Sequence, residues 1–453
     1  MKKSPRVHLI CSAHLDPIWQ WGWEEGLTEA MATFEVAADL MEEYPKFIFN
    51  HNESLLYEWT KMYRPDLFER IRKWVLAGRW NISGGWYLQP DCNFPCGESF
   101  IRQGLLGRTF FQKEFGVEPK VAYNFDSFGH HGNLPQILRE MGYEMYVHFR
   151  PLSQEKEIED FLYCWRGIDG SEITTLRPPC GWYNTATPED LRSKIEMMLT
   201  LARETGRDIT AFWGGGDHGG GATREDLEMI RKMSESIPEI GHSSLEAYWQ
   251  ALPRDLSALP VVEGELQKCM TGCYTSVIGT KQRNRRGEGL VLAAERYAAL
   301  AWWKLGKPYP QDKLKDVWKK ILYNQFHDIL PGSSVRRGTQ DSIEIYGHAF
   351  TLARELLLSS QLALLQTSKP RKPLALLIFN PQAVARRQIV EVDFTGAPHP
   401  QQLKGKTLQL LDSDGHPIAF QQLEPASSPE WRRRLLFEAN LPALGIAEYR
   451  IKI

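Results

Sequence analysis

From Arg6 to about Leu252, short apolar runs alternate with longer segments in which apolar residues recur at helical spacing. The apolar runs predict strands at Val7–Ala13, Phe47–Asn50, Trp80–Ser83, Val121–Phe125, Met145–Phe149 and Ile209–Trp213, with a hairpin over 161–176. The longer segments predict helices at Thr28–Tyr44, Glu53–Gly78 with a break at Pro65, Glu98–Phe115, Leu134–Met141, Pro188–Thr205 and Thr223–Ser236. Strands that alternate with helices form βαβ units, so we expect an α/β domain with a mainly parallel sheet of about seven strands and helices on both faces.

The pattern changes after about Asn284. Three long segments with helical spacing predict a three-helix bundle from Asn284–Leu305, Gln311–Phe326 and Ser334–Thr367. Ser368–Pro373 has the composition of a linker. Beyond it, four segments predict a small antiparallel β domain from Leu374–Phe379, Gln388–Phe394, Thr407–Leu411 and Trp431–Phe437. We therefore expect three domains, at residues 1–260, 261–367 and 374–453.

Composition narrows the class of protein. The 453 residues carry a net charge of −2, which argues against a surface for nucleic acid or for an anionic membrane. No apolar run of about 20 residues exists to span a bilayer, and the N-terminus lacks the features of a signal peptide. The seven cysteines form no Cys-x-x-Cys pair, so we expect free thiols in a cytoplasmic protein.

Candidate metal ligands follow the first predicted strand. His14 and Asp16 are two residues apart in extended backbone, so both side chains point the same way. An imidazole with a carboxylate is half of a divalent-metal site and suits zinc, although His-x-Asp also occurs by chance. The other candidates at strand ends are four charged residues and one tryptophan, namely Asp91, Asp126, Arg150, Asp217 and Trp86. In a parallel sheet, loops at the carboxyl ends of the strands converge on one cleft.

Taken singly, three candidates also have a purely structural explanation. Asp126 would cap a turn, Asp217 would lie in a flexible glycine-rich loop, and His327 would cap a helix. Together, His14, Asp16, Asp126 and His327 give two imidazoles and two carboxylates, which is a zinc-like set. Asp126 and Asp217 give two carboxylates for nucleophile and acid/base roles. The 15 tryptophans suit sugar rings as platforms, but most are expected in the core.

Four motifs in this order resemble glycoside hydrolase family 38, the zinc-dependent retaining α-mannosidases. They are His14-Leu-Asp16-Pro-Ile-Trp19, Gly84-Gly-Trp-Tyr-Leu-Gln-Pro-Asp91, Asn124-Phe-Asp126-Ser-Phe-Gly129-His130 and Phe326-His327-Asp328. Gly216-Asp217-His218-Gly-Gly-Gly221 is similar to a bacterial version of the acid/base loop. The resemblance runs from about Val7 to Ile453 and includes the change from α/β domain to bundle to β domain.

The resemblance implies specific roles for these residues. One zinc ion would be held by His14, Asp16, Asp126 and His327, the last of which the bundle contributes. Asp126 would also be the nucleophile, and Asp217 the general acid and then the general base. The residues expected to bind the terminal mannose of an α-mannoside are Trp19, Phe128, Asp328, Arg150, Asp91 and Trp86.

Two alternatives to a complete mannosidase stay open. One is a zinc hydrolase of another bond, such as a carbohydrate N-deacetylase. The other is a mannose-binding protein or one half of a two-chain mannosidase. The family usually continues into a large β-sandwich domain, whereas this sequence stops at Ile453. We therefore expect a second chain that supplies the further domain, or else a homo-oligomer.

Overall fold

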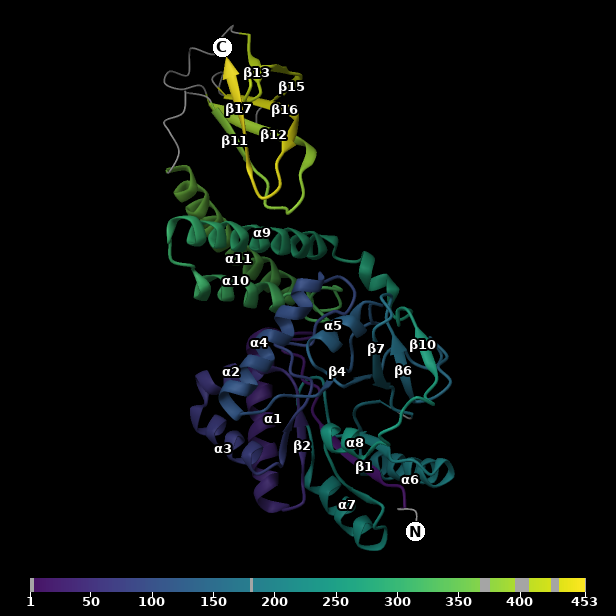
Figure 1. Cartoon of the computed structure of the whole chain (residues 1–453). Helices are drawn as coiled ribbons and strands as arrows, with labels where there is room; N and C mark the ends of the chain where they lie inside the picture. Colours follow the sequence, from purple (N-terminus) through teal and green to yellow (C-terminus); the bar gives the residue numbers. More distant parts are fainter. Residues whose placement is uncertain (1–3, 180–181, 367–374, 396–406, 425–431, 453) are drawn as a thin grey trace. The chain divides into compact units, whose positions relative to one another are not determined.

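A computed structural model describes residues 4–179, 182–366, 375–395, 407–424 and 432–452 (Figure 1). The chain divides into two compact units, one of residues 1–289 with 315–352 and the other of residues 290–314 with 353–453. The first unit holds the α/β region. The predicted linker Ser368–Pro373, together with Leu374 and Trp431 of two predicted strands, lies outside the described residues.

The first sheet is entirely parallel and is built around β1 (Val7–Ser12), whose six residues are all buried. Residues Val7 to Cys11 pair with the whole of β8 (Ile209–Trp213), and the end of β1 pairs with β2. The other members are β2 (Phe49–His51), β3 (Trp80–Ile82) and β9 (Ile240–His242). The central pair β1 and β8 is buried along its whole length and mainly apolar, as expected for strands that are covered on both faces.

A second sheet has the order β10-β6-β7-β5-β4. Its strands are β4 (Val121–Asn124), β5 (Met145–His148), β6 (Leu162–Arg166), β7 (Glu172–Leu176) and β10 (Val261–Glu263). β6 and β7 form the predicted antiparallel hairpin, and the other pairs are parallel. The predicted fold class is confirmed, with the strands divided between two sheets rather than joined in one.

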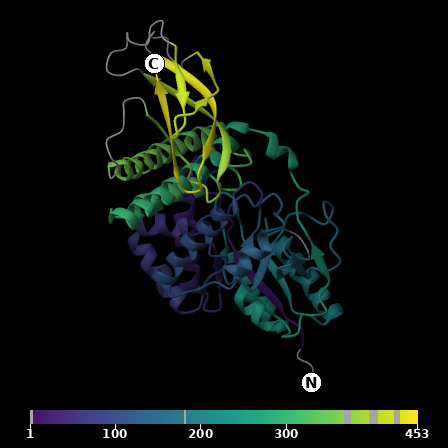
Figure 2. The same ribbon diagram turned by 45° about the horizontal axis from the view of Figure 1, so that its top comes forward.

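Helices cover these sheets. They are α1 (Trp23–Glu43), α2 (Ser54–Tyr63), α3 (Pro65–Leu76), α4 (Gly97–Phe115), α5 (Leu134–Glu140), α6 (Pro188–Thr205), α7 (Arg224–Ser236) and α8 (Leu245–Ala251). The predicted break at Pro65 is confirmed, because this proline begins α3. α1, α2 and α3 lie together in both ribbon views (Figure 2), and their apolar faces join β1, β2 and β3 in one core cluster.

The predicted three long helices are present as α9 (Ile278–Leu305), α10 (Gln311–Tyr323) and α11 (Arg336–Gln366), preceded by the short 3₁₀ helix η1 (Thr271–Thr275). The division between the two compact units passes through all three long helices. Tyr323 ends α10, and the turn that follows contains His327. The domain boundaries given above remain a prediction from the sequence.

The C-terminal region is antiparallel β structure, as predicted. Its strands are β11 (Ala375–Phe379), β12 (Arg386–Thr395), β13 (Gln409–Leu411), β14 (Pro417–Ile418), β15 (Phe420–Leu423), β16 (Arg432–Leu441) and β17 (Ile446–Lys452). They form one sheet of four strands and one of three, which share a core that includes Leu410, Leu435 and Tyr449.

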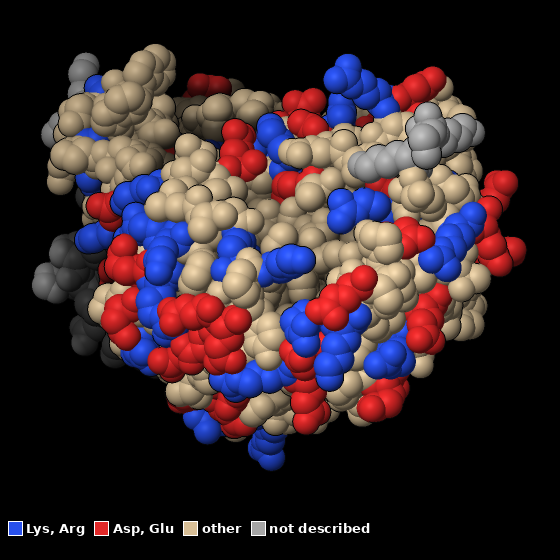
Figure 3. All heavy atoms as spheres, turned by 90° about the horizontal axis from the view of Figure 1, so that it is seen from below, with Lys and Arg blue, Asp and Glu red and all other residues tan. Residues whose placement is uncertain are grey.

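Charged side chains of both signs share the surface of the molecule. One face carries lysine and arginine interspersed with aspartate and glutamate, without a field of one sign (Figure 3). No helix within the described parts of the chain is long and apolar enough to cross a bilayer. The six cysteines in those parts are free thiols, as predicted, and Cys180 lies outside them.

Candidate functional site

β1 delivers His14 and Asp16 to the carboxyl end of the first sheet. The chain leaves the sheet here but stays tied to the loop after β8, because the Asp217 N–H donates to the His14 carbonyl at 2.6 Å and the Asp16 N–H to the Asp217 carbonyl at 2.9 Å. Behind them, Gly26 of α1 lies so close to Pro17 that a Cβ atom would stand 2.2 Å from its carbonyl oxygen. Both loops and α1 therefore fix the two side chains.

His327 reaches the same place from the turn after α10. The turn is joined to the loop after β3 by the Asp91 N–H, which donates to the Gln325 carbonyl at 2.8 Å. His327 Nε2 lies 3.4 Å from Asp16 Oδ1, and His14 Nε2 lies 3.0 Å from the same oxygen. His327 thus converges with His14 and Asp16, from which it is remote in the sequence, as the sequence predicts.

These three side chains have the features of a metal centre. His14 Nε2, Asp16 Oδ1 and His327 Nε2 are buried and make no hydrogen bond. Such atoms are costly to bury unless a ligand meets them. His327 Nδ1 lies 3.3 Å from the Gln89 carbonyl, which can only accept, so Nδ1 carries the proton and Nε2 offers its lone pair. The residues therefore fit zinc, which nitrogen and oxygen ligands suit.

The charges of the metal-free cluster follow from its composition. Burial lowers the pKa of His14, but the adjacent Asp16 carboxylate and the more distant Asp217 and Asp126 outweigh it and raise the pKa to about 10. Burial raises the pKa of Asp16, yet His14 and His327 lower it to about 2. The acidic side chains around His14 therefore favour a positive charge at this place.

Asp126 follows β4 and lies at the edge of this cluster. Its Oδ2 is 3.9 Å from His327 Nε2, while Arg150 Nε donates to its Oδ1 at 2.6 Å. Arg150, after β5, is held in turn over the Phe128 and Trp182 rings, 5.6 and 4.6 Å from their centroids. Asp126 thus has one oxygen fixed by a cation and the other directed toward the cluster.

Asp217 lies in the glycine-rich loop after β8. The loop closes on itself through hydrogen bonds in both directions between Gly215 and Gly221. Asp217 itself has a φ of 72°, which is uncommon for a residue with a side chain. Tyr183 OH donates to its Oδ1 at 3.0 Å. Burial is the main cause that raises the pKa of Asp217, so this carboxyl retains its proton more readily than an ordinary aspartate.

Two further predicted residues, Asp328 and Phe128, lie beside His327, and a third, Trp19, follows Asp16 in the chain. Asp328 Oδ2 is 3.7 Å from His327 Nε2, its Oδ1 accepts a hydrogen bond from Ser333, and burial raises its pKa to about 7. Phe128 meets the His327 ring edge-on at 6.4 Å. Trp19 is partly exposed, and its carbonyl accepts from the Val335 N–H at 2.8 Å, which joins it to the segment before α11.

Two residues predicted to bind substrate, Trp86 and Asp91, are fully buried, and their substrate-binding role stays a prediction. Trp86 is fully buried in a core cluster, and its indole N–H donates to the Tyr123 carbonyl at 3.0 Å. Asp91 is also fully buried, and its carboxylate accepts from the backbone of Asn93 and Phe94 and from Tyr274 OH. Trp86 therefore stabilises the core, and Asp91 holds the shape of its own loop.

Two residues that were not predicted, Gln89 and Tyr183, position the site. Gln89 accepts from the Phe125 N–H at 2.8 Å and places its amide nitrogen 3.4 Å from His14 Nδ1. It lies inside the quoted Gly84–Asp91 motif, so its location was a signal. Tyr183, whose ring lies 4.8 Å from that of His14, had no such signal because its loop shows no motif.

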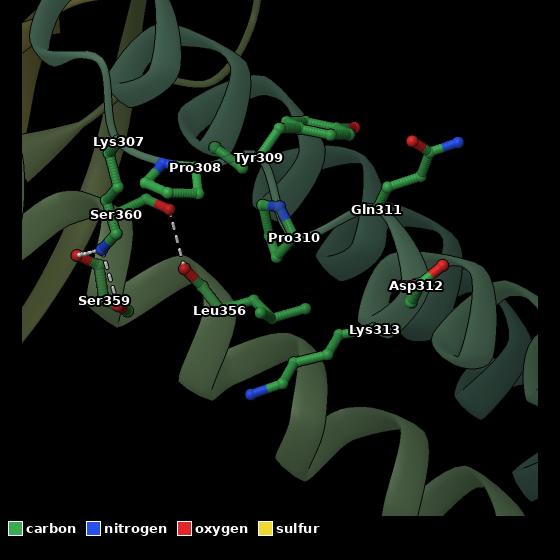
Figure 4. Close-up of a pocket in the computed structure, with 11 residues that line it drawn as sticks. Lys307, Pro308, Tyr309, Pro310, Gln311, Asp312, Lys313, Leu356, Ser359 and Ser360 are labelled. Carbon is green, nitrogen blue, oxygen red and sulfur yellow. Dashed lines mark hydrogen bonds between the residues drawn. The ribbon is translucent and has the colours of Figure 1, made fainter.

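The second compact unit contains a separate pocket of about 570 Å³ (Figure 4). Lys307, one of the residues that line it, donates from Nζ to the carbonyl and hydroxyl of Ser359, both at 2.7 Å. None of the predicted site residues lines this pocket.

Two family models match consecutive parts of the chain. The family model described as "Glycosyl hydrolases family 38 N-terminal domain" matches residues 4–267, and that described as "Alpha mannosidase middle domain" matches 268–364. Alpha-mannosidase G of Dictyostelium discoideum is 32% identical over 362 residues, which are 78% of this chain and 33% of that protein. Alpha-mannosidase 2C1 of Homo sapiens is 30% identical over 408 residues, 87% of this chain and 38% of that protein.

A solved structure has the same fold. The alpha-mannosidase from Enterococcus faecalis V583 superposes with a TM-score of 0.79 at 22% identity, over 99% of this chain and 56% of that one. The chain thus spans about a third of the curated relatives described above. The N-terminal family model matches residues 4–267, which is more than half of the chain and includes His14, Asp16, Asp126 and Asp217. The chain therefore belongs to glycosyl hydrolase family 38.

Proposed function

We propose that this chain carries the catalytic site of a zinc-dependent α-mannosidase that hydrolyses terminal α-linked mannose with retention of configuration. The observation that carries the proposal is the convergence of His14, Asp16 and His327, with Asp126 Oδ2 only 3.9 Å from His327 Nε2. The relatives named above are α-mannosidases, which supports the substrate class.

Asp126 and Asp217 have the contrasting environments that a double displacement requires. Arg150 balances the negative charge of Asp126, whereas burial favours the protonated form of Asp217. Because Tyr183 OH donates to Oδ1 of Asp217, the other oxygen is free to hold the catalytic proton. A retaining mechanism further requires the two carboxyl groups to lie about 5–5.5 Å apart.

In the first step, a carboxylate oxygen of Asp126 forms a bond to C1 of the mannose. The bond from C1 to the glycosidic oxygen breaks, and that oxygen takes the proton of Asp217. In the second step, a water oxygen bonds to C1 while Asp217 removes a proton from it, and the ester bond to Asp126 breaks. Mannose leaves with its original anomeric configuration, and both carboxyls return to their starting states.

The other residues hold the components in place. His14, Asp16, Asp126 and His327 would hold zinc, which when bound supplies a positive charge and Lewis acidity toward sugar oxygens. Asp328, with one oxygen held by Ser333, is suited to accept hydrogen bonds from sugar hydroxyls. Trp19 offers a partly exposed ring on which a pyranose can stack.

Trapping of the covalent intermediate tests the proposal. A mannosyl substrate that reacts quickly at C1 but is released slowly should leave one mannosyl group on the peptide that contains Asp126, detected by mass spectrometry. Asp126→Asn should not be labelled. An N-deacetylase uses no glycosyl intermediate, and a binding protein performs no reaction, so an unlabelled, zinc-loaded protein would exclude the retaining mechanism.

A further inference from the structure

A groove outside the catalytic site lies between α1, α2, the end of α10 and the first half of α11. It has a volume of about 620 Å³, within the range of pockets that hold small organic ligands. Trp23, Trp59, Tyr87 and Tyr323 supply aromatic rings to its lining. All of these residues belong to the first compact unit. None of the predicted catalytic or metal-ligating residues lines the groove.

The aromatic rings are arranged as adjacent platforms. The Trp23 and Trp59 rings have centroids 6.3 Å apart and planes inclined at 47°. Both indoles are partly exposed, while the neighbouring Met62 is 71% exposed. Rings that are open on one side and inclined to each other can contact the apolar C–H faces of a sugar chain that curves between them.

The polar groups of the groove are already positioned. Lys319 donates to both carboxylate oxygens of Glu58, at 2.7 and 2.6 Å, and its Nζ lies 5.6 Å from the centroid of the Tyr87 ring. Lys320 is paired with Asp316 at 2.5 Å. Fixed donors and acceptors beside aromatic rings lose little entropy when they bind hydroxyl groups.

Tyr323 adds an observation that points to a ligand. The residue is only 7% exposed, and its buried hydroxyl has no hydrogen-bond partner. A buried hydroxyl without a partner costs free energy, and a hydroxylated ligand in the groove would supply one.

Charge decides the class of ligand. Two lysines and two acidic residues line the groove, namely Lys319, Lys320, Asp316 and Glu344, so its formal charges cancel. A groove of this kind has no net attraction for a polyanion, and its aromatic platforms match a neutral polyhydroxylated chain better than an ionic one.

We infer that this groove is a second carbohydrate-binding site, which holds a neutral oligosaccharide away from the site of hydrolysis. That the sugar is α-linked mannose rests on the proposed function. The groove would keep the enzyme on a polymeric substrate and raise the local concentration of chain ends without taking part in the reaction.

Affinity electrophoresis of the folded chain in gels that contain soluble α-mannan tests the inference. We expect mannan to retard the protein, and we expect Trp59→Ala to raise the apparent Kd at least tenfold. Trp303→Ala is the matched control, because Trp303 of α9 is 76% exposed and lies outside the groove. Trp59 also contacts the core, so its substitution could affect folding. Tyr323→Phe is therefore a second variant, which removes only the unpartnered hydroxyl and should raise the apparent Kd severalfold.

Hydrolysis of a small aryl α-mannoside separates this inference from the proposed function. Both groove variants should hydrolyse it at the rate of the parent protein, but Trp59→Ala should act more slowly on mannan. Equal retardation of the parent protein and both groove variants would overturn the groove assignment even if the aryl mannoside is hydrolysed. Retardation by dextran alone would overturn the assignment to mannose, and binding of an apolar peptide in preference to either polysaccharide would overturn the carbohydrate assignment.

Discussion

Glu246 of α8 allows the stability of the α/β unit to be predicted as a function of pH. Its Oε2 accepts a hydrogen bond from Ser83 Oγ at 2.8 Å, and its Oε1 is buried without a partner. Burial raises the pKa of this carboxyl from 4.5 to about 7. In the unfolded chain the group ionises near its ordinary pKa, so between these two values the folded state binds more protons than the unfolded state.

The free energy of unfolding therefore falls as the pH rises from the pKa of Glu246 in the unfolded state through its pKa in the folded state. At 1.36 kcal/mol for each pH unit, the difference between 4.5 and about 7 corresponds to about 3 kcal/mol. Glu246→Gln replaces the carboxyl with a neutral group of the same shape. We expect it to raise the free energy of unfolding by about 3 kcal/mol at pH 8 and by less than about 1 kcal/mol at pH 5.

Urea unfolding followed by tryptophan fluorescence, at several pH values, measures this difference. Glu140→Gln serves as the control because Glu140 of α5 is exposed, and it should change stability by a similar small amount at every pH. A difference between the Glu246→Gln and parent proteins that does not vary with pH would refute the argument, because it would mean that Glu246 ionises alike in both states.

Three substitutions near the site have distinct expected effects. Gly26→Ala should lower the zinc content and destabilise the chain by about 1–3 kcal/mol, because the added methyl group would displace Pro17. Gly289→Ala, on an open face of α9, is the control and should stabilise the chain by about 0.5–1 kcal/mol. Metal analysis and urea unfolding measure both effects. Asp217→Asn should slow hydrolysis of mannosides with poor leaving groups by about 10²–10⁴-fold, and much less for an activated aryl mannoside, because only the former need a proton; equal losses would contradict the general-acid role. Tyr183→Phe should reduce kcat about tenfold, in line with the loss of one hydrogen bond to Asp217, while far-UV circular dichroism stays unchanged; an unaltered kcat would contradict the positioning role.

The sequence predicts most of the fold because the longer elements carry their own hydrophobic pattern. The break at Pro65 and the β6–β7 hairpin have local causes, and both are confirmed. The strands β9 and β10 were missed, and they form by pairing with β1 and β6; β14, β15 and β17 of the C-terminal region were missed as well. The division into two sheets was missed as well, because periodicity identifies strands but not their partners.

For the site, the polar residues at strand ends indicate His14 and Asp16, whereas His327 follows a helix, and the pattern does not give the direction of every side chain. His14, Asp16 and His327 lie together as expected. Trp86 and Asp91 occupy loop positions with the same pattern, yet one points into the core and the other binds its own loop. That choice depends on neighbours such as Tyr123 and Tyr274, which are remote in the sequence.

The most direct test of the account is hydrolysis of an aryl α-mannoside by this chain, measured before chelation, after chelation and after return of zinc, beside Asp126→Asn. The account predicts activity that chelation abolishes and zinc restores, and none in the Asn variant with zinc bound. Activity that survives removal of the metal, or an Asp126→Asn variant as active as the parent protein, would contradict it.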